Sequence, residues 1–422
     1  MLDVDFIRQN PEIVKNGIAK KNVDPKLVDR FLYLDLEWRE KTTLLNQLKS
    51  EQNKLNKELA QNKTDDRINR AKILKDRIAD LNEEKKKIDE KRIEILYKLP
   101  NLPLEDVPIG KDDSENKVLK IVGNPTKFDF EPKDYLILSE KIDLVDVERA
   151  SKVSGSRFGY LKNEAALMEF AIIKLVFDTL LPEGFIPVVT PALIKQEMMK
   201  AMGFLDRHED EAETYFLPQD NLYLIGTAEQ SLGPMHAREV FNYKDLPKRY
   251  IGFSSCFRRE AGSYGKDTKG IFRVHQFDKL EMFSFTKPED SEKEHQLFLS
   301  LEEKLMSSLE IPYRVINICT GDLGNVAAKK YDIEAWFPGQ NQYRETHSTS
   351  NVTDYQARRL NIHYKDSKGK LHLVHMINGT AFAIGRILIA IFENYQNKDG
   401  SITIPKVLQG YLGKEKIVPR YE

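Results

Sequence analysis

Long apolar runs and cysteines are scarce in this chain. No apolar run reaches the length of about 18 residues that a transmembrane helix needs, so we expect no membrane contact. The first residues, MLDVDFIRQN, lack the basic-then-apolar order of a signal peptide, which favours a cytoplasmic protein. Only Cys256 and Cys319 occur, far apart, so neither a disulfide framework nor a cysteine-based zinc site is supported and no zinc is expected.

Two nucleotide-binding motifs and a strong net charge are also missing. Neither GxGxxG nor GxxxxGK[ST] occurs, so a bound nucleotide would have to be held by side chains. The net charge of -1 at pH 7 means that any nucleic-acid contact must come from local basic patches. The 422 residues, 41% of them hydrophobic and 31% charged, are enough for two or three globular domains.

The segment between Pro25 and Pro100 has no glycine and no internal proline, and its apolar residues follow a heptad pattern. The first seam contains Phe31, Leu34, Trp38, Leu45, Leu48, Leu55 and Leu59, with Lys41 and Gln52 as polar members. The second contains Ala71, Leu74, Ile78, Leu81, Ile88 and Ile95, interrupted by Lys85 and Arg92. Between them, QNKTDD offers Thr64 or Asp65 as an N-cap. The pattern predicts a coiled-coil hairpin of two antiparallel helices over about 27–98.

The role of this hairpin stays open at this point. Most coiled coils are spacers or dimerisation devices, and charges on their exterior usually serve solvation. A nucleic-acid contact is the alternative, because basic residues gather near the tip. They are Lys54, Lys57, Lys63, Arg67, Arg70, Lys72 and Lys75.

The remainder of the chain mixes sequence patterns typical of helices with patterns typical of strands. Composition divides the chain into a helical domain at 1–100, a Pro- and Asp-rich linker at 101–120 and a second domain at 121–422. A helix is predicted over Ala165–Leu181. Strands are predicted at Phe185–Val189, Leu222–Ile225, Tyr250–Arg259, Ile271–Phe285, Tyr313–Cys319, Tyr331–Phe337, Ser348–Asp354, Ile362–Tyr364 and Leu371–Met376. Because many strands follow one another without a helix, we expect an α+β fold with a mainly antiparallel sheet.

One hairpin, FRREAGSYGKDTKGIFRVHQFDKLEMF (257–283), is unusually charged for a sheet. In the second strand the odd positions are Arg273, His275, Phe277, Lys279 and Glu281, and most even positions are apolar. The same alternation puts Arg258 and Glu260 on one face and Arg259 on the other, where it is peripheral. An exposed face with ion pairs is the simpler interpretation, but the long connecting loop favours a functional surface.

This hairpin resembles motif 2 of class II aminoacyl-tRNA synthetases, in the form found in seryl-tRNA synthetases. Other segments resemble landmarks of that family in the right order: ERASKVSGSRF (148–158), GTAEQSL (226–232), FPGQNQYRETHSTSNVTDYQARRLNI (337–362) and HMINGTAFAIGRILIAIFENYQ (375–396). The N-terminal hairpin is also a family hallmark, so the resemblance covers nearly the whole chain. It implies activation of L-serine with ATP to seryl-adenylate and pyrophosphate, then transfer to the terminal adenosine of tRNA(Ser); charging of tRNA(Sec) stays open.

The resemblance also implies residue roles. Arg258 would bridge the α-phosphate and the amino-acid carboxylate, and Arg386 would cover the adenine and reach the γ-phosphate. The implied ATP-binding residues are Arg258, Arg259, Glu260, Val274, Phe277, Glu345, Thr346, His347, Ser348 and Arg386. The implied serine-binding residues are Thr227, Ala228, Glu229, Glu281, Asn378 and Thr380. Glu345 and Ser348 match the family's Mg²⁺ ligands, with an ion pair from Glu345 to Arg344 or Arg358 as the alternative.

Further implications concern partners. The long helix and the strand that ends before Pro191 correspond to motif 1, which implies a homodimer, and the hairpin would contact the long variable arm of tRNA. The chain departs from the family at Arg259, where a small residue is usual, and at His347 and Thr380, where ETHS and NGTA replace EISS and NGSG. Two rivals are a class II paralogue that loads a carrier protein and a non-catalytic protein that retains the fold.

Overall fold

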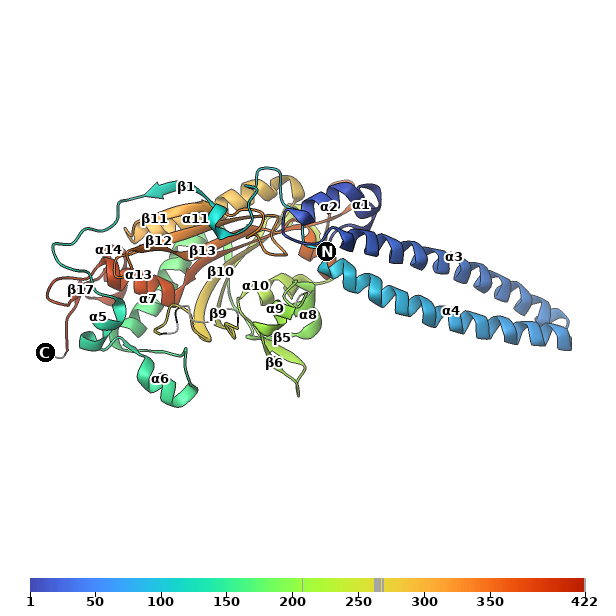
Figure 1. The fold of residues 1–422 in the computed structure, drawn as a ribbon, viewed down its shortest axis with the longest axis horizontal. Helices are drawn as coiled ribbons and strands as arrows, with labels where there is room; N and C mark the ends of the chain where they lie inside the picture. The colour runs from blue at the N-terminus through green and yellow to red at the C-terminus, as the bar shows by residue number, and fades with distance from the viewer. Residues whose placement is uncertain (207, 262–266, 268, 421–422) are drawn as a thin grey trace. The chain divides into compact units, whose positions relative to one another are not determined.

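The computed structural model describes residues 1–206, 208–261, 267 and 269–420 (Figure 1). It divides into two compact units, Met1–Leu102 and Pro103–Glu422. Within the described residues, no helix combines the length and the apolar character that a membrane crossing requires.

The first unit is entirely helical. Two short helices, α1 (Val4–Gln9) and α2 (Pro11–Ala19), precede the long helices α3 (Lys26–Gln61) and α4 (Asp65–Lys98). The long helices form the predicted antiparallel pair (Figure 1). Of the two candidate N-caps, Thr64 is the one used, since its side chain accepts a hydrogen bond from the Arg67 N–H at 3.4 Å.

The predicted seam forms the core of the long hairpin. Its central residues, Leu45, Leu48, Leu74, Ile78 and Leu81, form one buried cluster. The polar interruptions also have partners: Lys41 Nζ lies 2.6 Å from Glu84 Oε2, and Lys85 Nζ lies 4.8 Å from the centre of the Trp38 ring. Polar seam positions are thus satisfied across the hairpin, as a coiled-coil register requires.

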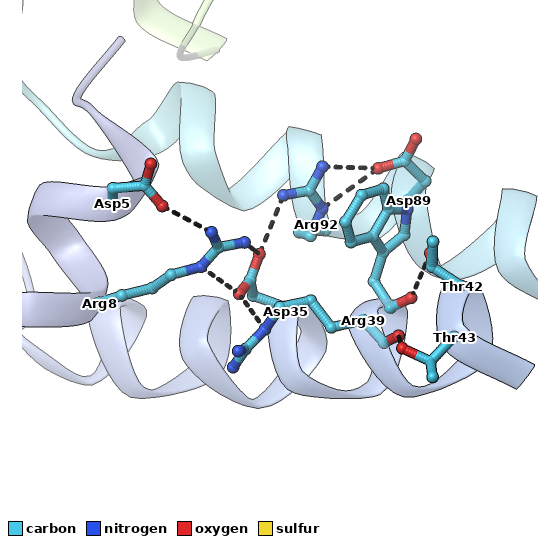
Figure 2. A network of polar contacts seen from close by, with 9 residues as sticks. Asp5, Arg8, Asp35, Arg39, Thr42, Thr43, Asp89 and Arg92 are labelled. Carbon is cyan, nitrogen blue, oxygen red and sulfur yellow. Dashed lines mark hydrogen bonds and ion pairs between the residues drawn. The ribbon is translucent and has the colours of Figure 1, made fainter.

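A charge network closes the base of the hairpin around one buried aspartate (Figure 2). Asp35, whose side chain is fully buried, pairs with Arg8 at 2.8 Å, Arg92 at 3.1 Å and Arg39 at 3.2 Å. Burial raises the pKa of Asp35, but the arginines, Arg8 above all, outweigh it and hold the pKa below its usual value. The unpredicted short helix α1 therefore contributes a cation to this unit's core.

The second unit is built on an eight-stranded sheet whose strands are antiparallel except for β4 and β9 (Figure 1). In spatial order they are β1 (Lys117–Val122), β11 (Tyr313–Asn317), β12 (Lys329–Phe337), β13 (Gln342–Asn351), β16 (His375–Ala383), β10 (Gln276–Thr286), β9 (Lys248–Phe257) and β4 (Phe185–Val189). The mainly antiparallel sheet predicted from the sequence is confirmed.

Helices cover one face of this sheet. The main core includes α7 (Asn163–Leu180), α11 (Ser291–Ser308) and α13 (Ile384–Asn394), together with inward-facing strand residues such as Leu280 and Met282. The other helices of this unit are α5 (Tyr135–Ile142), α6 (Val147–Ser154), α8 (Gln196–Ala201), α9 (His208–Ala212), α10 (Glu229–Leu232), α12 (Tyr355–Leu360) and α14 (Lys406–Leu412). Because strand side chains alternate, the residues next to Leu280 and Met282 face away from this core.

Smaller sheets complete the unit. They are β15 (Leu371–Leu373), β14 (His363–Lys365) and β8 (Val240–Asn242); β5 (Leu193–Lys195), β7 (Leu222–Leu224) and β6 (Tyr215–Leu217); β2 (Val145–Asp146) with β3 (Tyr160–Leu161); and β17 (Ile402–Thr403) with β18 (Lys416–Ile417). The single strand predicted at Leu371–Met376 is therefore two strands in the structure: β15 ends at Leu373 and β16 begins at His375.

Two predictions about the charged hairpin are wrong. Strand β9 ends at Phe257 and β10 begins only at Gln276, so 258–260 and 271–275 are not strand. The backbone N–H groups of Ile271 and His275 donate instead to Tyr135 Oη at 2.6 Å and Arg157 O at 2.9 Å, both outside the sheet. Because these backbone groups form hydrogen bonds outside the sheet, the two segments are not paired as strands. Their side chains therefore need not alternate between the two faces of the sheet.

The predicted linker is also partly structured. Lys117–Val122, which overlaps the end of the predicted 101–120 linker, pairs with β11 as an edge strand. Its apolar residues are mostly exposed, which explains why the sequence pattern gave no sign of a buried strand.

We expect Asp35→Ala to destabilise the first unit by about 3–5 kcal/mol, because it leaves buried arginine charge uncompensated. Asp5→Asn, which removes an exposed partner of Arg8, should cost less than about 1 kcal/mol. Urea unfolding of the full chain, followed by Trp38 fluorescence in a Trp336→Phe background, measures both. Equal small losses would contradict the role of Asp35.

Because folding lowers the pKa of Asp35, its contribution to the free energy of unfolding should be complete above the unfolded pKa of about 4 and fade as pH falls below it.

Candidate active site

A cavity lies on the polar side of the sheet in the second unit. We call it the central cavity; its lining residues are Arg258, Glu260, Ile271, Phe272, Arg273, Val274, Phe277, Lys279, Glu345, Thr346, Thr380, Ala383, Gly385 and Arg386. They come from β10, β13, β16, the start of α13 and the segments on either side of the hairpin loop. Segments far apart in the sequence thus meet around one hollow.

Two β-bulges aim side chains into this cavity. One lies between Ile333 and Glu334 of β12, where Thr346 is the extra residue of β13, so that Glu345 and Thr346 both line the cavity. The other lies opposite Leu280 and Glu281, with Ala381 as the extra residue of β16. A bulge breaks the alternation of a strand and redirects side chains, which is common beside functional sites.

Arg258 follows the end of β9 and faces the cavity. Its backbone N–H donates to His275 O at 3.0 Å, its Nε donates to Gly226 O at 3.2 Å, and its guanidinium lies 5.2 Å from the centre of the Phe277 ring. Among the residues that the structure describes, no carboxylate forms an ion pair with it. A guanidinium held by neutral contacts retains its full charge for an anion.

Glu260 turns the chain away from the sheet and toward the cavity. Its φ of 52° lies in the left-handed region, and its carboxylate accepts a bond from Arg273 Nη1 at 2.7 Å. Arg157 Nη1 donates to its carbonyl at 3.2 Å. A strained backbone held by contacts on both sides fits a residue whose position matters for function.

Arg386 lies on the cavity wall at the start of α13. Its Nη1 lies 3.2 Å from Glu345 Oε1 and donates to Glu345 O at 3.1 Å, and its guanidinium lies 4.9 Å from the Phe272 ring centre. Burial raises the pKa of Glu345, but Arg386 and other cations lower it overall. The two alternative partners of Glu345 pair with other acids: Arg344 with Asp267, and Arg358 with Asp354.

A cluster of polar residues adjoins the central cavity. Glu229, at the start of α10, accepts hydrogen bonds from Asn378 Nδ2 at 3.1 Å and Gln356 Nε2 at 3.3 Å. Thr227 Oγ1 accepts from Lys279 Nζ at 3.3 Å, and Lys279 forms an ion pair with Glu281. We call Thr227, Glu229, Glu281, Asn378 and Thr380 the polar cluster; all five are buried.

The predicted residues do not all reach the cavity. Arg259 is peripheral as expected: its Nε donates to Thr214 O at 2.7 Å and its guanidinium lies over the Tyr215 ring. His347 is buried against Phe382, and burial lowers its pKa to about 3, so it is neutral. Ser348 and Ala228 belong neither to the lining of the central cavity nor to the polar cluster, and Ala228 packs in a second core.

Three contributors were missed by the sequence analysis. Phe272 was assigned to the packed face and is indeed buried in the main core, but it also lines the cavity, where the guanidinium groups of Arg344 and Arg386 lie 3.6 Å and 4.9 Å from its ring centre. Lys279 was placed on the polar face without a role. Gln356, which bonds Glu229, lies in α12 and gave no signal, because an isolated glutamine on a helix carries no pattern.

The fold and this cavity define a class II aminoacyl-tRNA synthetase core. The family description "tRNA synthetase class II core domain (G, H, P, S and T)" matches residues 215–395, and "Seryl-tRNA synthetase N-terminal domain" matches residues 1–103. A crystal structure of seryl-tRNA synthetase from Pyrococcus horikoshii complexed with ATP has a TM-score of 0.92 at 42% identity and covers 99% of this chain and 100% of that one.

Other relatives are similar over their whole length. Serine–tRNA ligase from Dictyoglomus turgidum is 49% identical over 100% of both chains. The structure of cytoplasmic serine–tRNA ligase from Naegleria fowleri in complex with AMP has a TM-score of 0.87 at 35% identity and covers 100% of this chain and 99% of that one. The chain belongs to the seryl-tRNA synthetase family.

A buried acid behind the site gives a test of the electrostatics. Glu302, in α11, is fully buried, and within the described part of the chain neither of its carboxyl oxygens has a hydrogen-bond partner. A Cβ at Gly379 would lie 2.9 Å from its Oε1, so this glycine makes room for it. Burial, with Glu281 and Asp332 nearby, raises the pKa of Glu302 well above its usual value.

We expect Glu302→Gln to stabilise the protein at pH 8 by on the order of 1–3 kcal/mol and to have little effect near pH 4.5. An acid whose pKa is raised by folding binds more protons in the folded state, so stability falls as pH rises above its unfolded pKa; the amide removes that loss. Thermal unfolding between pH 4.5 and 8 measures the difference. A gain that does not grow with pH would contradict a protonated Glu302.

Proposed function

We propose that the central cavity and the polar cluster together activate L-serine with ATP and transfer the seryl group to the terminal adenosine of tRNA(Ser). Family membership supports the reaction, and the Pyrococcus relative was crystallised with ATP. One observation supports the assignment of the site: Arg258 faces the cavity without a carboxylate partner among the described residues, opposite a second arginine, Arg386. The carrier-loading and non-catalytic rivals account for neither the relatives nor the N-terminal domain.

The first step brings two anions together. An oxygen of the serine carboxylate forms a bond to the α-phosphorus of ATP, the bond from that phosphorus to the oxygen bridging to the β-phosphate breaks, and pyrophosphate leaves. Repulsion between the carboxylate and the phosphates opposes this approach. Arg258 can hold both with its planar fork, and fixed charge stabilises the transition state without reorganisation.

The second step moves the seryl group. A hydroxyl of the terminal ribose of tRNA attacks the seryl carbonyl carbon and releases its proton, the bond from that carbon to the phosphate oxygen breaks, and AMP leaves with the negative charge. Arg258 again faces the group that gains charge. One set of cations therefore serves both steps.

The ATP contacts that we propose follow the family resemblance, and the residues concerned line the central cavity. Glu260 would accept from the adenine amino group, Phe277 would stack on the ring beside the Val274 backbone, and Arg386 would lie over its other side. Phe272 supports Arg386 from behind, because a guanidinium stacks well on an aromatic face. Arg259 lies outside the cavity, so we expect at most an indirect role.

A magnesium ion would be held by Glu345, with Ser348 as the second family position. Glu345 suits it: its pKa is lowered, so it is ionised, and its oxygens are hard donors. Such an ion would neutralise phosphate charge when bound. Thr346 lines the cavity, but its hydroxyl already donates to Ile333 O at 3.2 Å.

The polar cluster fits a small hydroxylated amino acid. Glu229 and Glu281 offer negative charge for the ammonium group, and Thr227, Asn378 and Thr380 offer polar partners for the carboxylate and the hydroxyl. A pocket built around a hydroxyl rejects alanine because its polar groups are left unpaired. The methyl group that Thr380 adds relative to the family serine narrows the pocket and disfavours threonine.

A homodimer is supported by an apolar surface on motif 1. Leu167 and Phe170 of α7 and Ile186 and Val189 of β4 are exposed, the last by 78%. Clustered apolar exposure on an edge strand and its neighbouring helix is typical of a subunit interface. We propose that two copies pair there, in the cytoplasm, where the tRNA substrates occur.

The arginine pair 258 and 259 tests the assignment directly. Wild-type protein should catalyse ATP–pyrophosphate exchange with serine and far less with alanine, glycine or threonine. We expect Arg258→Ala to reduce kcat/KM by about 10²–10³, as for loss of a transition-state donor. Arg259→Ala is the matched control and should change it by less than about threefold. Equal effects of the two substitutions would remove Arg258 from its role.

Basic residues near the hairpin tip test the tRNA contact. Lys57, Lys63 and Lys72 are exposed. Changing all three to Glu should lower kcat/KM for tRNA(Ser) by about tenfold or more and weaken its salt dependence, because phosphate contacts release counterions. Serine-dependent pyrophosphate exchange serves as the control and should not change. A loss of both activities would contradict the division of labour between hairpin and cavity.

A further inference from the structure

The polar cluster contains two buried acids, and its own residues supply no positive charge to balance them. Glu229 and Glu281 are both buried and both acidic. Burial, together with the charge of Glu281, raises the pKa of Glu229 to about 7. Two carboxyls in one buried site tend to share a proton, which would leave less negative charge for an ammonium group.

Lys279 lies where its positive charge can balance the two acids. It is two residues before Glu281 on β10, on the same face of the strand, and pairs with that carboxylate. Its side chain is 10% exposed and lines the central cavity beside Arg258 and Thr380. Its charge also lowers the pKa of Glu229.

The same ammonium group fixes the hydrogen bonding of Thr227. Because an ammonium group can only donate, Thr227 Oγ1 accepts from Lys279 Nζ at 3.3 Å, and it also accepts from the Glu229 N–H at 3.4 Å. Both lone pairs of the hydroxyl oxygen are then used, and its hydrogen is left for a ligand. One lysine therefore connects a charged and a neutral member of the cluster.

We infer that Lys279 is a positioning residue for the amino acid: it holds Thr227 and Glu281 in place and balances the cluster's negative charge, so that the cluster binds a small zwitterion. This inference rests on the proposed function. It assigns to Lys279 a larger effect on serine than on ATP, because its hydrogen bond to Thr227 and its ion pair with Glu281 lie in the cluster, although its side chain also lines the central cavity.

A second buried lysine of the same sheet serves as a matched control. Lys329, in β12, is 2% exposed and pairs with Asp106 at 2.5 Å and Glu292 at 2.8 Å, and it lines neither the central cavity nor the polar cluster. Loss of either lysine removes the ion pairing of a buried ammonium group and should lower the melting temperature. Only loss of Lys279 should alter the use of serine.

The test is steady-state ATP–pyrophosphate exchange by the full chain, with Lys279→Met, Lys279→Arg and Lys329→Met. Lys279→Met should raise KM for serine by about tenfold or more, the effect of one lost charged hydrogen bond, and change KM for ATP by less than about threefold. Lys279→Arg should recover part of the loss. Lys329→Met should leave both KM values unchanged.

A pH profile separates positioning from a merely structural role. The groups that face Glu229 are Glu281, Lys279, Arg258, Gln356 and Asn378. Without the lysine, Glu229 holds its proton to higher pH, so the acid limb of kcat/KM for serine should move to higher pH in Lys279→Met. It should stay in place in Lys329→Met.

Equal changes in both KM values, or an unmoved acid limb, would overturn the inference. If Lys279→Met does not fold, Lys279→Gln, which keeps a hydrogen-bond donor and loses the charge, carries the test, and an unchanged KM for serine in that variant would count against positioning. The proposed function is tested separately with the wild-type protein. Pyrophosphate exchange that does not depend on serine would contradict the proposed function, whatever the variants show.

Discussion

Charge balance on the polar face of one antiparallel sheet is the constraint on which the rest of the site depends. Ionised groups that lose contact with water are tolerated only when paired or hydrogen-bonded. Most cations around the central cavity satisfy this rule with a nearby carboxylate, as Arg386 does with Glu345 and Arg273 with Glu260. Arg258 is the exception among the described residues. Its charge is supported by neutral groups and stays available to an anionic ligand.

The same rule shapes the helical unit, where it serves stability. Asp35 gathers three arginines at the base of the hairpin, and the polar members of its seam have partners across the two helices (Figure 2). A heptad pattern with polar interruptions fixes the register, since any shift would separate the pairs. Buried charge thus specifies the arrangement in one unit and supports chemistry in the other.

Irregular backbone decides which side chains reach the central cavity. The two bulges in the sheet, the left-handed conformation of Glu260 and the non-strand segment 271–275 each redirect side chains that regular strands would place elsewhere. Phe272 shows the consequence, because it is buried in the main core and also lines the cavity beside Arg344 and Arg386. Regular elements build the sheet, and departures from regularity build the site.

The sequence by itself determined the long helices, the antiparallel character of the sheet and the family, because these rest on local periodicity and on motifs that a single chain displays. It also placed Arg258 and Arg259 on different sides. Only the tertiary structure decided the strand ends, the cavity position of Phe272 and the partners of Lys279 and Glu345. The physical reason is that bulges, backbone hydrogen bonds to distant loops and ion pairs between strands join residues far apart in the chain, and no local pattern records them.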